Sequence, residues 1–307
     1  MKRKHLLGLH DVSRQEIEKI LNNAAFMKKV IVSDHKRIPT LQGKSVVTLF
    51  YENSTRTRMS FELASKYMGA ASANMSASAS SVAKGETLVD TGATLDMMGV
   101  DVIIMRHPMS GAPHLLSQHV HASVVNAGDG MNEHPTQALL DMYTIQEKRG
   151  GLDGMKIAII GDVLHSRVAR SNAYGMKTMG ADLYFAGPST LMPPGFDRLG
   201  VHVGNDVRAA VENADVVMGL RIQRERQRAG LFPSVREYAH FFGIDMNVLK
   251  LAKKDALVMH PGPVNRGVEL SSFAADCEQS VIREQVQNGV AVRMAVLDML
   301  TRKEQTR

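Results

Sequence analysis

Seven short apolar runs alternate with longer segments of helical periodicity along this chain. Uninterrupted apolar runs of this length, bounded by Gly, Asp, Asn or Pro, are typical of strands buried on both faces of a sheet. The runs lie at 45–51, 101–106, 122–127, 155–161, 181–186, 215–220 and 256–260, and helical segments at 55–68, 135–149 and 166–179 lie between them. The alternation predicts an α/β protein whose parallel sheets are flanked by helices.

The domain organisation follows from length and from one glycine-rich break. A chain of 307 residues is long enough for two domains. Three glycines within 150–154 precede a fresh strand, so we expect a first domain at 1–150 and a second at 151–285. No strand follows the last helical stretch, about 286–307, and we expect this helix to pack back on the first domain.

The composition indicates which classes of ligand this protein could bind. The formal net charge is +6, which favours anionic ligands, nucleic acid among them. The basic residues are scattered, Trp is absent and aromatics make up only 5%, so small anionic substrates are favoured over nucleic acid. Cys277 is the single cysteine, which excludes an intrachain disulfide and disfavours a cysteine-based metal cluster. No signal-peptide or transmembrane pattern is evident, so we expect a cytoplasmic protein with no membrane contact.

The strongest candidate binding segment is Ser54-Thr55-Arg56-Thr57-Arg58, where a strand ends and a helix begins. Ser54 is a plausible N-cap, and Met59, Leu63 and Tyr67 recur at helical spacing, which predicts the core face of the helix. A helix start offers unpaired N–H groups and a positive dipole end, and hydroxyls and guanidinium groups add to both. The segment is suited to a phosphate. The alternative is a capped helix with surface arginines.

Two further candidates belong to the first half of the chain. Arg106 ends a predicted strand, and side chains at that end of a parallel strand face the crevice where α/β proteins bind ligands. In His134-Pro135-Thr136-Gln137, Pro135 suits the first position of a helix. The dipole there favours a neutral His134, which could donate a hydrogen bond to a carbonyl. The alternatives are an exposed loop arginine and a helix-capping histidine.

Three candidates in the second half also follow predicted strands. Arg167 lies at a helix start, and this junction lacks the glycines of a dinucleotide-binding loop. Arg221 and Gln223 open a charged run that could equally be a solvated surface. His260-Pro261-Gly262-Pro263 forms a stiff turn whose carbonyls could accept hydrogen bonds from an amide. Residues 70–81, rich in Ala and Ser, are expected to form a functional loop.

No motif for a cofactor, a metal or a covalent intermediate is present. We therefore expect no cofactor and no metal. What remains is a set of cations, hydroxyls and one histidine, which suits the positioning and electrostatic stabilisation of a highly charged transition state.

Taken together, 54–58, 134–137 and 260–263 resemble the carbamoyltransferase family, in family order over essentially the whole chain. Ser80 and Lys84, in the stretch 80–87, match a loop of the aspartate-specific branch that enters the active site of a neighbouring subunit. Ornithine-specific members carry a cysteine after the histidine of the last motif, where this chain has Pro261. The family commonly has Leu at the position of Gly262; because the contact there is made by the backbone, the change is expected to cost little.

The resemblance implies a role for each matching residue. Domain 1–150 would bind carbamoyl phosphate and domain 151–285 would bind aspartate. The carbamoyl phosphate set would be Ser54, Thr55, Arg56, Thr57, Arg106, His134, Gln137, Gly262 and Pro263. The aspartate set would be Lys84, Arg167, Arg221 and Gln223, and the catalytic set would be Arg56, Thr57, Arg106, His134 and Lys84.

The resemblance to the aspartate-specific branch implies transfer of the carbamoyl group of carbamoyl phosphate to the α-amine of aspartate, in pyrimidine biosynthesis. Shared active sites imply at least a homotrimer, and it stays open whether regulatory chains or another pyrimidine-pathway enzyme bind it. Three alternatives also stay open. One is another carbamoyltransferase, acting on ornithine or a related amine. The second is a non-catalytic anion-binding or assembly protein, and the third is a nucleic-acid-binding protein, which would associate with duplexes tightly and in a salt-sensitive way.

Overall fold

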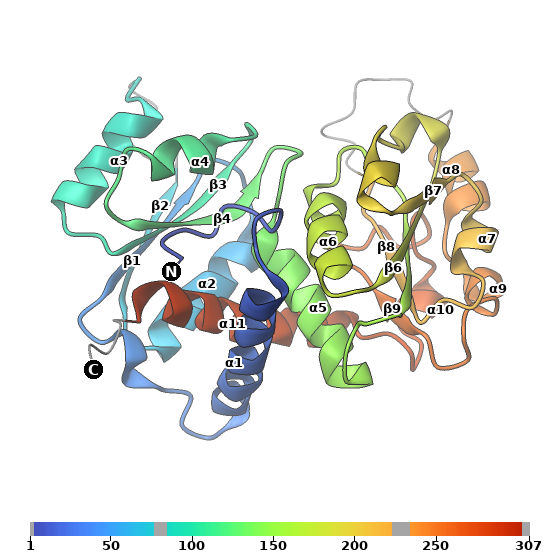
Figure 1. Cartoon of the computed structure of the whole chain (residues 1–307), viewed down its shortest axis with the longest axis horizontal. Helices are drawn as coiled ribbons and strands as arrows, with labels where there is room; N and C mark the ends of the chain where they lie inside the picture. The colour runs from blue at the N-terminus through green and yellow to red at the C-terminus, as the bar shows by residue number, and fades with distance from the viewer. Residues whose placement is uncertain (1–2, 77–84, 223–233, 303–307) are drawn as a thin grey trace. The chain divides into compact units, whose positions relative to one another are not determined.

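The computed structural model describes residues 3–76, 85–222 and 234–302 (Figure 1). By its internal contacts the chain divides into two compact units, Met1–Leu140 with Gln287–Arg307, and Asp141–Val286. Each unit contains one parallel sheet flanked by helices, and this confirms the predicted fold class.

The sheet of the first unit has the strand order β2-β1-β3-β4, with every pairing parallel. Its strands are β1 (Ser45–Phe50), β2 (Ala71–Ser76), β3 (Val102–His107) and β4 (Ser123–Asp129). One face packs on α3 (Leu88–Met97) and α4 (Ala112–Ser117). Figure 1 shows α1 (Arg14–Val32), α2 (Thr55–Tyr67) and α11 (Ile282–Thr301) on the other face. Strands β1, β3 and β4 are apolar because both faces of this part of the sheet are covered.

Strand β2 is a correction to the sequence analysis, which expected a loop at 70–81. Among the described strands β2 pairs with β1 alone, in a register that matches Ser45 with Ala71, and all six of its side chains are exposed or half-buried. An edge strand is held by backbone hydrogen bonds and needs no apolar run. The small, mostly polar residues of β2 therefore gave no strand signal in the sequence.

The core face of α2 is a second correction. Met59 is 51% exposed, whereas Phe61, Ala64 and Met68 are fully buried. Both sets recur at helical spacing, so periodicity alone could not decide which face turns inward.

The sheet of the second unit has the order β7-β6-β5-β8-β9, again parallel throughout. Its strands are β5 (Lys156–Ile160), β6 (Asp182–Ala186), β7 (His202–Gly204), β8 (Val216–Gly219) and β9 (Leu257–Met259). One face packs on α7 (Val207–Val211), α9 (Met246–Leu249) and α10 (Ser272–Ala275). Figure 1 shows α6 (Arg167–Thr178) on the opposite side of this sheet and α8 (Val235–Phe242) near α7. Short 3₁₀ turns complete the connections, at Pro39–Leu41, Ser189–Leu191 and Phe196–Leu199.

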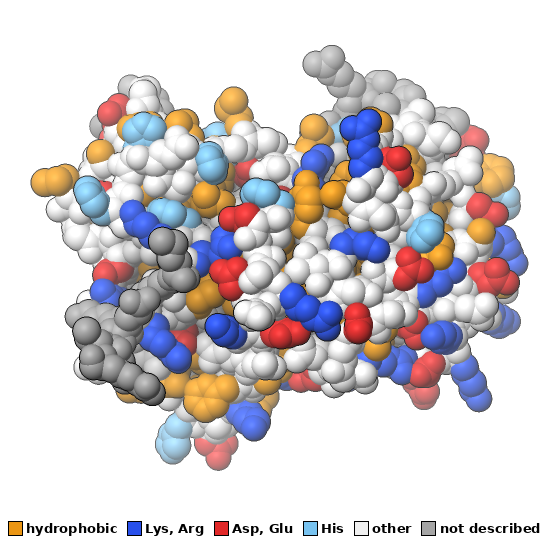
Figure 2. Space-filling model, viewed as in Figure 1, with side chains coloured by type: hydrophobic (Ala, Val, Ile, Leu, Met, Phe, Trp, Pro, Cys, Tyr) orange, Lys and Arg blue, Asp and Glu red, His pale blue; other side chains and the backbone are white. Residues whose placement is uncertain are grey.

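Two helices contribute residues to both units, α5 (Pro135–Arg149) and α11. None of the helices in the described ranges combines the length and apolar character that crossing a membrane requires. On the face that Figure 2 shows, Lys and Arg side chains are interspersed with Asp and Glu rather than gathered into one stripe.

Candidate active site

Three predicted segments of the first unit meet at one edge of its sheet. The start of α2 follows β1, Arg106 lies near the end of β3, and the start of α5 follows β4. These strands are parallel neighbours, and Phe50 pairs with Arg106 in the register of β1 and β3. Because carboxyl ends of neighbouring parallel strands share one edge, the structure brings these segments together as expected.

The start of α2 has the form expected for an anion site. Ser54 is the N-cap, with extended backbone and no side-chain capping hydrogen bond, so its hydroxyl is not used to cap the helix. The amide of Arg58 closes the first helical bond onto Ser54, at 3.2 Å. The preceding N–H groups have no acceptor within the helix, as at any helix start. Thr57 is buried, 8% exposed, whereas Thr55 and Arg56 are exposed.

Arg106 is fixed by two acceptors. Its Nε lies 3.1 Å from Oε2 of Glu52, and its Nη1 donates to the carbonyl of Ala127 at 3.2 Å. Both side chains of the ion pair are less than a fifth exposed. A guanidinium held in this way is restricted in orientation before any ligand arrives. The sequence analysis did not place Glu52 beside Arg106, although Glu52 precedes the hydroxyl-rich helix start by only two residues.

His134 and Gln137 lie at the start of α5, and Pro135 is its first residue, as predicted. Both side chains are buried, at 4% and 8% exposed. The carbonyl of His134 accepts hydrogen bonds from the amides of Gln137 and Ala138. His134 therefore directly precedes the first residue of α5, at the positive end of the helix dipole.

The turn before His134 is held by two buried carboxylates that the sequence analysis missed. Asp129 accepts hydrogen bonds from the amide of Gly111 at 2.7 Å and from the side chain of Asn126 at 2.7 Å. Glu133 accepts a bond from the amide of Leu9 at 2.7 Å. Asp129 is 1% and Glu133 3% exposed. The sequence did offer one signal for Asp129: it is an acidic residue just after the end of a predicted buried strand, a position that often carries functional side chains.

The predicted segments of the second unit also meet at one sheet edge. Arg167 follows β5, Arg221 follows β8, and Gly262 with Pro263 follows β9. Strands β5, β8 and β9 are parallel neighbours in that order. The structure therefore places these four residues at the carboxyl ends of three adjacent strands.

Local hydrogen bonds define two of these segments. Ser166 caps α6 by accepting from the amide of Ala169 at 3.1 Å, and Arg167 is the first helical residue, only 4% exposed. In the segment after β9, the amide of Gly262 donates to Nδ1 of His260 at 2.8 Å. Gly262 has φ +64°, a conformation that L side chains rarely adopt.

Three candidate residues lie outside the described ranges: Ser80, Lys84 and Gln223. The structure therefore brings together two groups of the predicted residues, one in each unit, and does not describe these three.

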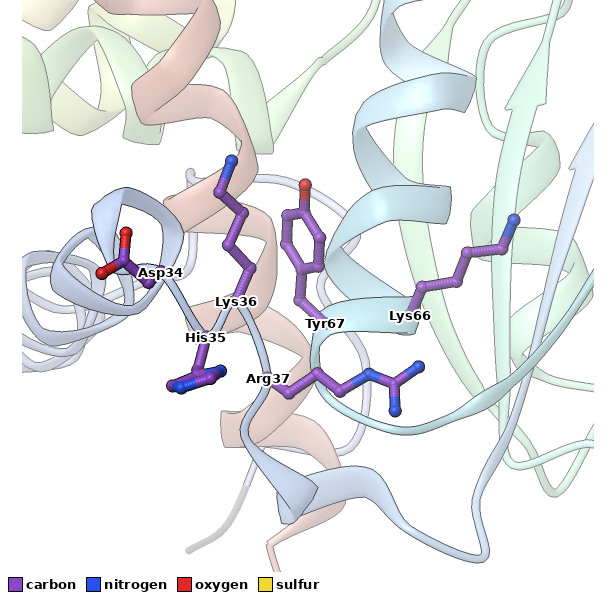
Figure 3. Close-up of a pocket in the computed structure, with 6 residues that line it drawn as sticks. All are labelled: Asp34, His35, Lys36, Arg37, Lys66 and Tyr67. Carbon is purple, nitrogen blue, oxygen red and sulfur yellow. The ribbon is translucent and has the colours of Figure 1, made fainter.

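A separate hollow of about 410 Å³ in the first unit does not coincide with either group. It is lined by Asp34, His35, Lys36, Arg37, Lys66 and Tyr67. Figure 3 shows Lys36 extending alongside the ring of Tyr67, whereas Lys66 points away from both. Lys66 also pairs with Glu62 at 2.7 Å on the exposed side of α2. The basic side chains that line this hollow therefore do not converge on one point. Within the described ranges, no group of three or more His, Cys, Asp or Glu side chains is arranged to hold a metal ion.

Comparison with known proteins agrees with this arrangement. Residues 4–147 match the family model of the aspartate/ornithine carbamoyltransferase carbamoyl-P binding domain, and residues 153–300 match that of the Asp/Orn binding domain. The aspartate carbamoyltransferase catalytic subunit of Ruminiclostridium cellulolyticum is 67% identical over 303 residues, covering 99% of this chain and 97% of that protein. Its counterpart in Acetivibrio thermocellus is 66% identical over 304 residues, covering 99% and 97%.

A solved structure is also similar over nearly the whole chain. Aspartate transcarbamoylase from Trypanosoma cruzi, in complex with carbamoyl phosphate and aspartate, has a TM-score of 0.88 and 32% identity, covering 97% of each chain. The resemblance inferred from the motifs is confirmed. This chain belongs to the aspartate/ornithine carbamoyltransferase family.

Proposed function

We propose that this chain is an aspartate carbamoyltransferase. It transfers the carbamoyl group of carbamoyl phosphate to the α-amine of L-aspartate and yields N-carbamoyl-L-aspartate and phosphate, a step of de novo pyrimidine biosynthesis. The observation that carries the proposal is the clustering of its motifs: hydroxyls, arginines and a buried histidine share one sheet edge, on a chain 67% identical to an aspartate carbamoyltransferase catalytic subunit.

The first unit is assigned to carbamoyl phosphate. Ser54, Thr55, Arg56 and Thr57, with the amides of the α2 start and with Arg106, take the phosphate. The position of these residues at a helix start and the Ser54 hydroxyl, which does not cap the helix, support this assignment. Thr57, Arg106 and His134 polarise the carbamoyl oxygen, and Gln137 accepts a hydrogen bond from the carbamoyl amino group.

The second unit is assigned to aspartate and to the other side of the carbamoyl amino group. Arg167 and Arg221 pair with the two carboxylates of aspartate, together with Gln223, and Lys84 arrives from a neighbouring chain. Arginine suits this task because its planar guanidinium grips a carboxylate through two parallel hydrogen bonds. The backbones of Gly262 and Pro263 accept from the carbamoyl amino group. As domains, we propose 1–150 with the C-terminal helix for carbamoyl phosphate, and 151–285 for aspartate.

The mechanism follows from charge. Carbamoyl phosphate and aspartate are both anions, so their approach in a partly dry site costs several kcal/mol unless cations offset the repulsion. The neutral α-amine attacks the carbamoyl carbon and forms a tetrahedral oxyanion, which Thr57, Arg106 and His134 stabilise. The bond between the carbamoyl carbon and the bridging oxygen of the phosphate then breaks, and the departing phosphate takes the amine proton. No general base from the protein is required.

Assembly and location belong to the same proposal. A lysine contributed by a neighbouring chain, as in the family, supports an assembly of at least a homotrimer with shared active sites. We place the enzyme in the cytoplasm, consistent with a single cysteine in 307 residues.

One assay decides between aspartate and ornithine. The purified chain is given carbamoyl phosphate with either amino acid, and carbamoylated product and phosphate are measured. Turnover with aspartate alone supports the proposal, and turnover with ornithine alone contradicts it. No turnover with either, from a properly assembled trimer, would favour a non-catalytic anion-binding protein.

A further inference from the structure

A chain of buried polar side chains in the second unit ends at the segment that carries Gly262. Asp141, His260 and Gln285 are 0%, 1% and 3% exposed. Nε2 of Gln285 donates to Oδ1 of Asp141 at 2.8 Å. Oε1 of Gln285 accepts from the amide of His260 at 3.0 Å. Nδ1 of His260 in turn accepts from the amide of Gly262 at 2.8 Å. The three side chains therefore connect α5 to the Gly262 backbone.

The chemistry of its neighbours fixes which way the Gln285 amide points. A backbone amide can only donate, so the oxygen of Gln285 must face His260. Asp141 already accepts from the side chain of Asn172 at 3.1 Å, so a second donor facing it must come from the nitrogen of Gln285. Glutamate at 285 would instead bring a second carboxylate against Asp141 in a buried site, where like charges are costly.

The same logic fixes the tautomer of His260. Because Nδ1 accepts from the amide of Gly262, the ring proton belongs on Nε2. Nε2 lies 3.3 Å from Oε1 of Glu269, and both side chains are at most 1% exposed. The same Oε1 accepts from the amide of Asn265 at 2.6 Å, so Glu269 holds the far side of the segment. A doubly protonated His260 would direct an N–H against the N–H of Gly262.

We propose that Gln285 is a positioning residue for carbamoyl transfer. It holds His260 as a neutral, Nε2-protonated ring, and that ring orients the Gly262–Pro263 backbone that receives the carbamoyl amino group. The inference rests on the proposed function, because it assigns the amino group to this backbone. A carbonyl accepts well only within a limited range of directions, so a small rotation of this segment weakens catalysis more than it weakens phosphate binding.

The test uses Gln285→Glu in the full-length chain, with Gln279→Glu as the matched control. The side chain of Gln279 donates to the carbonyl of Lys254, in the same unit but outside the buried chain. Gln285→Glu is expected to lower kcat at least about tenfold, while the Kd for inorganic phosphate changes less than about twofold, since the residues assigned to phosphate lie in the first unit. Gln279→Glu is expected to leave kcat unchanged.

A compensating double variant separates positioning from a general loss of folding. In Asp141→Asn with Gln285→Glu, the new amide at 141 donates to the new carboxylate at 285, which still accepts from the amide of His260. We expect this variant to recover most of kcat. ¹⁵N NMR of wild-type His260 should show a protonated Nε2 and an unprotonated Nδ1.

Three outcomes would overturn the inference: Gln285→Glu that is folded with kcat within twofold of wild type, no recovery in the double variant, or a proton on Nδ1 of His260. The proposed function fails separately, if the wild-type chain does not carbamoylate aspartate.

Discussion

The guanidinium of Arg106 and the carboxylate of Glu52 form an ion pair, with Nε 3.1 Å from Oε2, at the sheet edge assigned to phosphate. The pair joins the end of β3 to the segment before α2. A phosphate that binds Arg106 through its guanidinium must compete with this carboxylate. Glu52 therefore keeps Arg106 ordered in the unliganded protein and also opposes the ligand.

Removing the charge of Glu52 is expected to strengthen phosphate binding. A partly buried pair of this kind contributes about 1 kcal/mol, so Glu52→Gln should lower the Kd for inorganic phosphate about three- to tenfold at low ionic strength. Isothermal titration calorimetry measures this directly, and the gain should shrink as salt is added.

Glu62→Gln is the matched control for this measurement. Glu62 lies on the same helix as the proposed phosphate site but pairs with Lys66, at 2.7 Å on the exposed side. Its substitution should leave the Kd unchanged. Phosphate binding that is equal or weaker in Glu52→Gln would show that the pair mainly orders Arg106.

Replacing His134 should impair the chemical step. A buried donor aimed at a developing oxyanion typically contributes about 10²- to 10³-fold to kcat. We expect His134→Ala to lower kcat by about that factor, because water cannot reproduce a donor held at the start of α5. The Kd for inorganic phosphate, which lacks the carbamoyl oxygen, should change little. A loss in phosphate affinity as large as the loss in kcat would move His134 from the carbamoyl oxygen to the phosphate.

The sequence predicted at which sheet edge each group of candidate residues lies, because each described member lies at or after the end of a strand that an apolar run identifies. Arg106 and His134 needed only the rule that parallel strands end at one edge. Contacts that depend on three-dimensional direction were not predictable. Nothing in the spacing indicates that Glu52 pairs with Arg106 or that Gln285 reaches Asp141, 144 residues away in the chain. Strand β2 was missed because its side chains are exposed or half-buried, so it carries no apolar run.

Hybrid trimers test the proposed contribution of Lys84 from a neighbouring chain. Lys84→Ala and His134→Ala homotrimers should each be nearly inactive. Mixed after dissociation and reassembly, they can form sites that take an intact Lys84 from one chain and an intact His134 from another. Activity should then return to a sizeable fraction of wild type, measured as carbamoyl aspartate formed per trimer. Hybrids as inactive as their parents would place both residues in sites built from a single chain.

The start of α1 makes stability depend on acid pH. Burial by itself would raise the pKa of Glu16, but hydrogen bonds from Arg3 and Ser13 outweigh burial and lower the pKa from 4.5 to about 2. A carboxylate whose pKa is depressed on folding stabilises the native state above its unfolded pKa, and this contribution is lost as pH falls through the folded value. Glu16→Gln should therefore cost about 1 kcal/mol of unfolding free energy at pH 7, after allowance for solvent screening. The difference from wild type should shrink between about pH 5 and pH 2; a constant difference over that range would exclude the charge as its cause.

Gly8 is expected to be intolerant of even one added carbon. A Cβ there would overlap Oε1 of Glu133, a residue that is 3% exposed and whose other oxygen, Oε2, accepts from the amide of Leu9 at 2.7 Å. The carboxylate cannot move aside without losing that bond, so Gly8→Ala should lower the unfolding free energy by about 1–3 kcal/mol, measured by urea denaturation. Gly151→Ala is the control: an added Cβ meets nothing within 4 Å, and the change should stay within about 0.5 kcal/mol. Because Glu133 directly precedes His134, kcat per folded molecule should also fall in Gly8→Ala. Equal stability of the two variants would show that the Glu133 side chain has room to move.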